Sequence, residues 1–188
     1  MSFLENLFKP KQTFGGIALD ANIKLVLALI FDDKETTSKK NIFEALLFTS
    51  VHTLKVMEQK YPHLHKQFKA DYLDILAKTA KKWSLIDVIN QNPVGYNSLN
   101  DIINNRFTIY EIELKKIFSD IENYSIIDLC NYFFSWQNAL SLNMRDSLTA
   151  ILVNEEKRKE LKHNIVEMLP IIEETVDIIS ITMDQTNK

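Results

Sequence analysis

The chain has 188 residues, of which 46% are hydrophobic and 25% charged, with 22 basic and 25 acidic side chains. This composition is typical of a soluble globular protein, and the length suits a single domain over 1–188. Glycine occurs only three times, where average usage of about 7% would give roughly 13. Folds that depend on glycine-rich phosphate loops or on many tight hairpin turns are therefore nearly excluded.

The beginning of the sequence has neither a basic leader nor a long apolar run, so we expect no signal peptide. The longest apolar stretch covers seven residues, 25–31, whereas a transmembrane helix needs about 20. The single cysteine, Cys130, fits a reducing compartment, because it has no internal disulfide partner. We therefore expect a cytoplasmic protein. Its excess of lysine over arginine, 19 to 3, suggests a bacterial, AT-rich genome.

Helical periodicity runs through almost the whole chain, and the alternation typical of strands is nearly absent. After a short amphipathic segment over 1–12, the pattern predicts helices over 17–31, from a cap at Thr37 or Ser38 to Tyr61, and from Pro62 to near Trp83. A serine or threonine followed three residues later by an acid resembles a capping box. Four such pairs predict further helix starts near residues 85, 99, 109 and 126.

Two helices in the second half of the chain complete the prediction. The helix over 126–142 is apolar around nearly its whole circumference, so we expect it to be the buried centre of the fold. A long C-terminal helix over 154–185 keeps a one-sided apolar stripe and is expected to kink at Pro170. The fold class is therefore an all-α, single-domain bundle of about seven to eight helices.

Few residue patterns point to chemistry. His52, His63 and His65 are the candidate metal ligands, although two histidines spaced two apart on a helix face different sides, so no cofactor is expected. Cys130 lies in an apolar helix, where a thiol is unreactive. The aromatic segment around it could instead line a pocket for an apolar small molecule. That candidate pocket consists of Cys130, Phe133, Phe134 and Trp136.

Charge is distributed unevenly along the chain. Residues 1–82 carry a net charge of +4 and residues 83–188 carry −7, and 164–187 contain five acids and no base. With three arginines in the chain, no nucleic-acid partner is expected. The leading hypothesis is a non-enzymatic protein-binding module, such as an immunity protein or an inhibitor of a basic effector. The predicted partner-binding residues are Glu167, Glu173, Glu174 and Asp177. A carrier of an apolar small molecule and a helical metalloprotein are the alternatives.

Overall fold

The computed structural model describes residues 13–30, 39–83, 85, 99–133 and 154–186. Within these ranges all regular structure is helical, and no strand occurs, which confirms the predicted all-α bundle. Six helices lie in this part of the chain, somewhat fewer than the seven to eight expected. They are α2 (Phe14–Leu29), α3 (Lys39–Lys60), α4 (Pro62–Lys82), α6 (Leu99–Ser119), α7 (Ile127–Phe133) and α9 (Glu155–Thr186).

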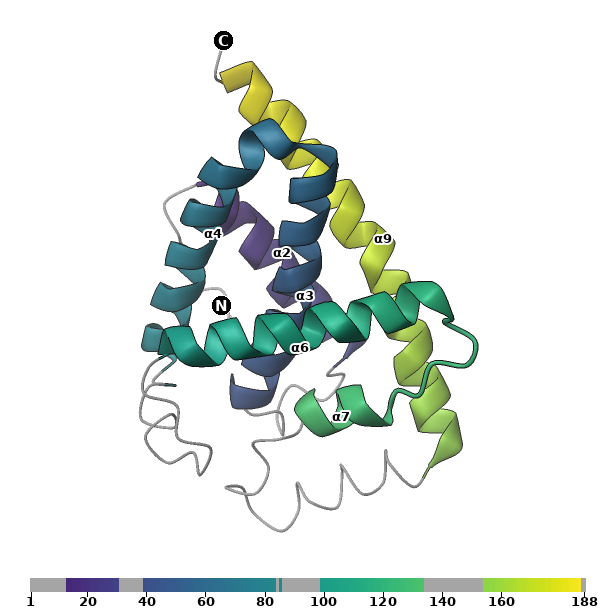
Figure 1. Cartoon of the computed structure of the whole chain (residues 1–188). Coiled ribbons are helices and arrows are strands. Elements are labelled where there is room, and N and C mark those ends of the chain that lie inside the picture. The colour runs from purple at the N-terminus through teal and green to yellow at the C-terminus, as the bar shows by residue number, and fades with distance from the viewer. Residues whose placement is uncertain (1–12, 31–38, 84, 86–98, 134–153, 187–188) are drawn as a thin grey trace.

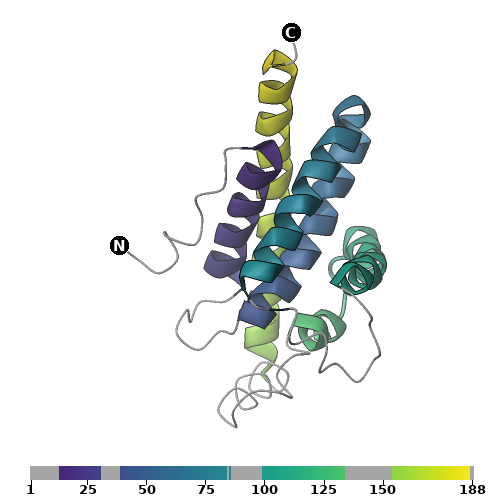
Figure 2. The same ribbon diagram turned by 90° about the vertical axis from the view of Figure 1, so that its left-hand side faces the viewer.

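Four helices form the body of the bundle. α2, α3, α4 and α9 lie side by side along a common direction, and α6 lies across them, so that Figure 2 shows α6 nearly end-on (Figures 1 and 2). The short helix α7 packs against α3. None of the helices in the described ranges is long and apolar enough to cross a membrane.

Local features of the sequence fix several helix boundaries, although α2 begins at Phe14 and not at the predicted residue 17. Thr13 caps α2, because its hydroxyl oxygen accepts a hydrogen bond from the amide of Gly16 at 3.1 Å. Pro62 occupies the first turn of α4, where its missing amide hydrogen costs nothing. The side chain of Asn154 accepts hydrogen bonds from the amides of Glu156 and Lys157 and so fixes the start of α9. Pro170 lies inside α9, which continues on both sides of it.

The predicted helix start near 109 is wrong. Thr108 lies inside α6, which is continuous from Leu99 to Ser119. Its hydroxyl donates to the carbonyl of Asn104 at 3.2 Å, as mid-helix threonines do, and caps no new helix. The prediction failed because the residue types of a capping box also occur within helices. The residues on either side of Leu85, 84 and 86–98, fall outside the described residues, so the predicted helix start near 85 stays a prediction, and the segment 134–142 falls outside them too.

The centre of the described structure is α3 rather than the segment near 126–142. Residues 41–54 are buried on every side of α3, and this helix packs against α2, α4, α6, α7 and α9. In α7 the side chains of Leu129, Cys130 and Phe133 are buried, whereas Ile127 and Asp128 are exposed. The described part of 126–142 is therefore one-sided, with one face on the core and one in solvent.

The close approach of α2 to α4 explains the glycine at position 15. A Cβ on Gly15 would lie 2.6 Å from the backbone nitrogen of Tyr72, which is closer than packed atoms can come. The amide of Gly15 also donates to the Asp71 carboxylate at 2.7 Å, so α4 supplies a cap to the start of α2. Glycine here allows the two helices to touch along their backbones.

A closed polar network joins α2, α3 and α4. The amide of Asn22 donates to the hydroxyls of Thr53 and Tyr72, each at 2.8 Å. The Tyr72 hydroxyl lies 2.8 Å from Ser50 Oγ, and Ser50 itself donates to the carbonyl of Leu46 at 2.6 Å. Since Ser50 has a single hydroxyl hydrogen, the Tyr72 hydroxyl donates to Ser50. Each hydroxyl hydrogen in this buried cluster thus has an acceptor, because Thr53 donates to Thr49.

Candidate functional site

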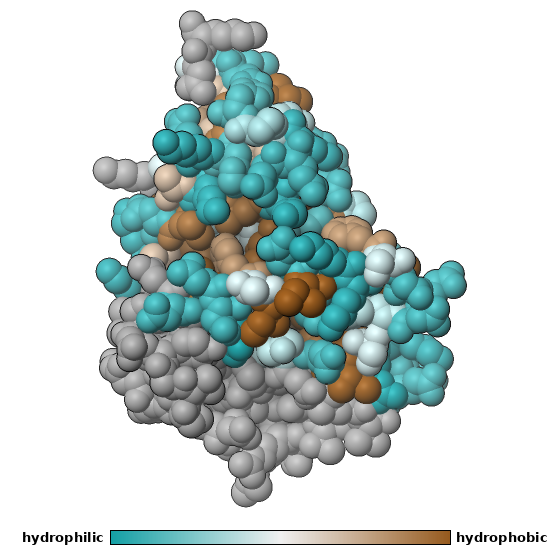
Figure 3. All heavy atoms as spheres, viewed as in Figure 1, coloured by the Kyte–Doolittle hydropathy of each residue, from teal (hydrophilic) through white to brown (hydrophobic). Residues whose placement is uncertain are grey.

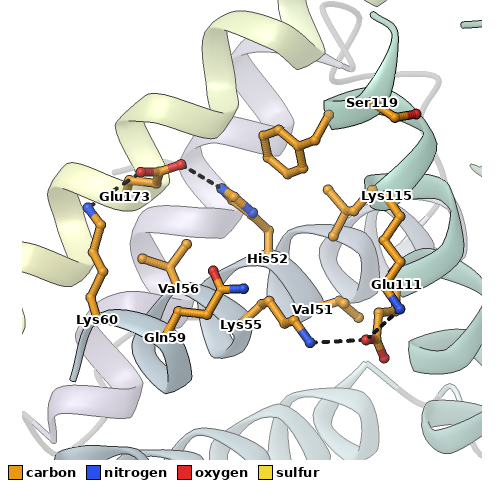
Figure 4. Close-up of a pocket in the computed structure, with 12 residues that line it drawn as sticks. Val51, His52, Lys55, Val56, Gln59, Lys60, Glu111, Lys115, Ser119 and Glu173 are labelled. Atoms are coloured by element: carbon orange, nitrogen blue, oxygen red, sulfur yellow. Dashed lines mark hydrogen bonds and ion pairs between the residues drawn. The ribbon is translucent and has the colours of Figure 1, made fainter. Parts of the chain in front are cut away.

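A half-open groove with a volume of about 500 Å³ lies between α3, α6 and α9 (Figure 4). Apolar side chains from α3 and α6 form much of its lining, namely Val51, Val56, Leu114 and Phe118. The Phe118 side chain is 60% exposed, an unusual exposure for a phenylalanine beside a cavity. In the space-filling view, apolar atoms show on and just above α6 within a largely hydrophilic surface (Figure 3).

His52 lies between the groove and α9. Its ring is 5.6 Å from the ring of Phe118 and is 3% exposed. Nε2 lies 3.3 Å from the carbonyl oxygen of Leu169 and 3.8 Å from Oε1 of Glu173. Because both neighbours are acceptors, the neutral ring carries its hydrogen on Nε2. Burial lowers the pKa of His52, and the contacts with Leu169 and Glu173 only partly oppose that effect.

One side of the groove carries an excess of positive charge, which we call the basic corner. It consists of Lys55 from α3 with Glu111 and Lys115 from α6. The Glu111 carboxylate lies 3.0 Å from Nζ of Lys55 and 3.3 Å from Nζ of Lys115 (Figure 4). Hydrogen bonds from Lys55 and Lys115 lower the pKa of Glu111. One carboxylate is therefore shared by two ammonium groups.

Two carboxylates and one lysine meet at the opposite side of the groove, at a place that we call the acidic corner. It consists of Lys60 from α3 with Glu173 and Asp177 from α9, of which Lys60 and Glu173 line the groove. Nζ of Lys60 lies 3.4 Å from Glu173 and 3.1 Å from Asp177, and the Tyr61 hydroxyl donates to Asp177 at 3.0 Å. Hydrogen bonding to Asp177 raises the pKa of Lys60. Figure 4 shows His52 between the two corners.

The structure places the four acids predicted as a partner-binding face in two settings. Glu173 and Asp177 face α3 and meet in the acidic corner. Glu174 is exposed, and Glu167 pairs with His163 at 3.1 Å on the exposed surface of α9.

The predicted aromatic pocket is described only in part, because Phe134 and Trp136 fall outside the described residues. Phe133 is fully buried, and its ring packs edge to face against Phe48 at 5.7 Å and Tyr110 at 6.3 Å. Cys130 is buried too, and burial raises the pKa of its thiol to about 11. A thiol with that pKa stays protonated near neutral pH and is a poor nucleophile.

The histidines proposed as metal ligands have separate environments. His52 faces Leu169 and Glu173, whereas Nε2 of His63 lies 3.1 Å from Asp184 near the C-terminal end of α9. His65 is half-buried in the first turn of α4. Across the described ranges, no group of three or more His, Cys, Asp or Glu side chains is arranged to hold a metal ion.

The residues of the groove other than His52 and Glu173 were missed by sequence reasoning. Phe118 follows the buried Ile117 and lies off the apolar stripe of α6, and an aromatic side chain in that position was the available signal. The spacing of Glu111 and Lys115 on α6 allows their pairing, but the approach of Lys55 depends on how α6 crosses α3. Comparison with protein-family models, with curated proteins and with solved structures finds no match to this chain.

Proposed function

We propose that this protein is a non-enzymatic helical protein-binding module and that its partner docks in the α3–α6–α9 groove. The observation that carries the proposal is Phe118, an aromatic side chain 60% exposed at the edge of an apolar cavity. Exposed aromatic residues beside a pocket are common anchors of protein interfaces, because their burial on binding contributes much of the affinity. The lone, unreactive Cys130 supports a cytoplasmic location as part of the same proposal.

The charge of α9 supports a basic effector as the partner, with this protein acting as its inhibitor or immunity protein. Two carboxylates share one lysine in the acidic corner, and Glu174 faces solvent nearby on the same helix. A basic side chain of the partner would restore charge balance in that corner. Inhibition would then follow from occlusion of the effector surface and would need no catalytic residue.

Site-specific photocrosslinking in the native host tests the docking site. A photoreactive phenylalanine analogue replaces Phe118 in the full chain, and the same analogue replaces Ile178 as the control. Ile178 is also 60% exposed but does not line the groove. We expect a stoichiometric protein adduct at position 118, with the crosslinked peptide of the partner identified by mass spectrometry, and little adduct at position 178. Equal labelling at both positions would refute docking in the groove.

A carrier of an apolar small molecule is the second candidate, because a volume of about 500 Å³ is within the usual range of ligand pockets. Native mass spectrometry of the untagged protein from its host separates the two functions. A bound protein partner supports the binding module, whereas an added mass of a few hundred daltons that Phe118→Asp abolishes supports the carrier.

A further inference from the structure

The outward side of α4 carries a row of lysines. This helix contains five lysines and two aspartates. Its buried side chains recur at every fourth position from Leu64 to Ala80, and the lysines are exposed on the remaining surface of the helix. With a rise of about 1.5 Å per residue, the row extends over about 24 Å. We call it the basic face, and it consists of Lys66, Lys69, Lys78, Lys81 and Lys82.

The two aspartates of α4 already have partners. Asp71 accepts a hydrogen bond from the amide of Gly15 at 2.7 Å, and Asp74 pairs with Lys78. Three further lysines of the basic face form no ion pair in the part of the chain that the structure describes, namely Lys66, Lys69 and Lys81. The basic face therefore keeps positive charge that the fold does not neutralise, although the net charge of the chain is −3.

An apolar stretch of sequence joins the structure beside the basic face. The contact of Gly15 with Asp71 holds the start of α2 against α4, so the chain enters α2 next to this helix. The twelve residues that precede Thr13 contain four large apolar residues and two lysines, which are Phe3, Leu4, Leu7, Phe8, Lys9 and Lys11. Lysines next to large apolar residues are the combination with which peripheral proteins bind membrane surfaces.

We infer that the basic face of α4 docks on an anionic lipid membrane. The ammonium groups attract the anionic headgroups, and each lysine close to such a surface adds to the binding. This contact is independent of the groove of the proposed function, since no residue of α4 lines that groove. In Figure 2, α4 lies at the front of the bundle, and α6, which forms one wall of the groove, lies to its right.

The side chains of α4 favour a lipid surface over a nucleic acid. Proteins that read or stack on bases use arginines and exposed aromatic rings. The helix has no arginine, and its Phe68 and Tyr72 are buried. Lysines alone supply a diffuse attraction to negative charge, which suits a surface whose headgroups rearrange beneath the protein.

Flotation of the full-length protein with lipid vesicles tests the inference. Vesicles that contain phosphatidylcholine and phosphatidylglycerol are compared with vesicles of phosphatidylcholine alone. We expect the protein to float with the anionic vesicles and to stay behind with the neutral ones. Raising the salt from about 0.1 M to about 1 M should release most of the bound protein, because the Debye length falls from about 10 Å to about 3 Å.

Two double charge reversals distinguish the basic face from the net charge of the chain. Lys66→Glu with Lys81→Glu changes the basic face, and Lys157→Glu with Lys159→Glu on α9 is the control. All four lysines are exposed, and the two variants have the same net charge, so circular dichroism should show both folded. We expect the α4 variant to lower the partition coefficient on anionic vesicles at least about tenfold, since each lysine near the surface contributes about fivefold. The control should change it by less than about twofold.

Equal losses for the two variants would overturn the inference, as would equal binding to both kinds of vesicle or no binding to either. A protein that does not float with anionic vesicles but binds a single-stranded RNA, and loses that binding only in the α4 variant, would assign the basic face to a nucleic acid instead. None of these results changes the test of the groove, which depends on crosslinking at position 118.

Discussion

Two regions of the molecule include α3: the interior between α2, α3 and α4, and the groove between α3, α6 and α9. Their polar side chains are paired differently. In the interior, Asn22, Ser50, Thr53 and Tyr72 form a closed network in which each hydroxyl hydrogen has an acceptor. In the groove, one carboxylate contacts two lysines at the basic corner, and one lysine contacts two carboxylates at the acidic corner. An aromatic ring there faces solvent. The two sides of α3 thus differ in whether their interactions are complete.

The closed network contributes to the stability of the fold, whereas the groove residues contribute to the proposed binding. A complete buried network holds the helices in one arrangement, since any shift leaves a polar group without a partner at a cost of about 1–3 kcal/mol. Unequally shared charges and an exposed ring contribute little to folding, because solvent competes for them. Under the proposed function, a second molecule would contact them. Mutations on the two sides should therefore have very different effects on the free energy of unfolding.

The largest expected difference is between two phenylalanines. Phe48→Ala should lower the free energy of unfolding by about 3–5 kcal/mol, since a fully buried ring is replaced by a cavity. Phe48 packs edge to face against Tyr110 at 5.6 Å and Phe133 at 5.7 Å, and these contacts are lost as well. Phe118→Ala should change the free energy by less than about 0.5 kcal/mol. Urea denaturation followed by far-UV circular dichroism measures both.

Similar losses for the two alanine variants would show that Phe118 belongs to the core, and the groove would then not be a free surface. A small loss for Phe48→Ala would show that the region around Phe133 can collapse or already contains space. That second result would also revive the hypothesis of an apolar ligand near Cys130 and Phe133.

A smaller effect is expected from removing one hydroxyl on each side of α3. Tyr72→Phe leaves Asn22 and Ser50 each with one partner fewer in a fully buried site, so the loss should be about 1–3 kcal/mol. Burial raises the pKa of Tyr72 to about 12, which keeps the hydroxyl protonated at neutral pH. Tyr61→Phe removes the half-buried contact with Asp177 and should cost less than about 1 kcal/mol. Equal losses would contradict the distinction between the closed and the open side.

The bundle class and several helix boundaries were predictable because they depend on local pattern. Signals such as Pro62 at the start of α4 and Asn154 at the start of α9 act over a few residues, and the apolar stripes of α4 and α9 indicate which face is buried. The Thr13 cap of α2 was not predicted. The identity of the central helix was not predictable in the same way. α3 buries polar residues such as Glu44 and Ser50, which find partners on α6 and α4, so its sequence resembles an amphipathic surface helix.

The groove could not be predicted from local sequence patterns either, because it also depends on contacts between helices that are distant in the sequence. Lys115 pairs with Glu111 four residues earlier on α6, but Lys55 is 56 positions from Glu111, and only the crossing of α6 over α3 brings it there. The acids of α9 were recognised as a group by their spacing in sequence. Their division into pairs that face α3 and acids that face solvent depends on where α3 and Lys60 lie.

The smallest expected effect is a pH dependence of the free energy of unfolding that comes from His52. This residue lines the groove, but its side chain is buried. Burial holds its pKa below the ordinary value of 6.5, so between the two values the unfolded chain binds a proton that the folded protein does not. The free energy of unfolding should therefore fall as the pH drops through about 6.5, and level off below the lowered pKa. His52→Gln keeps a donor for the Leu169 carbonyl but removes this titration.

The measurement is the difference in unfolding free energy between the wild type and His52→Gln, from urea titrations between about pH 7.5 and pH 5. Taking the difference cancels the carboxylates and the other histidines, which both chains share. The wild type should lose stability relative to the variant as the pH falls. A difference that is constant with pH would mean that His52 titrates normally and is open to solvent from the groove. A difference that grows in favour of the wild type would mean that Glu173 outweighs burial, and the acidic corner would then hold an imidazolium at low pH.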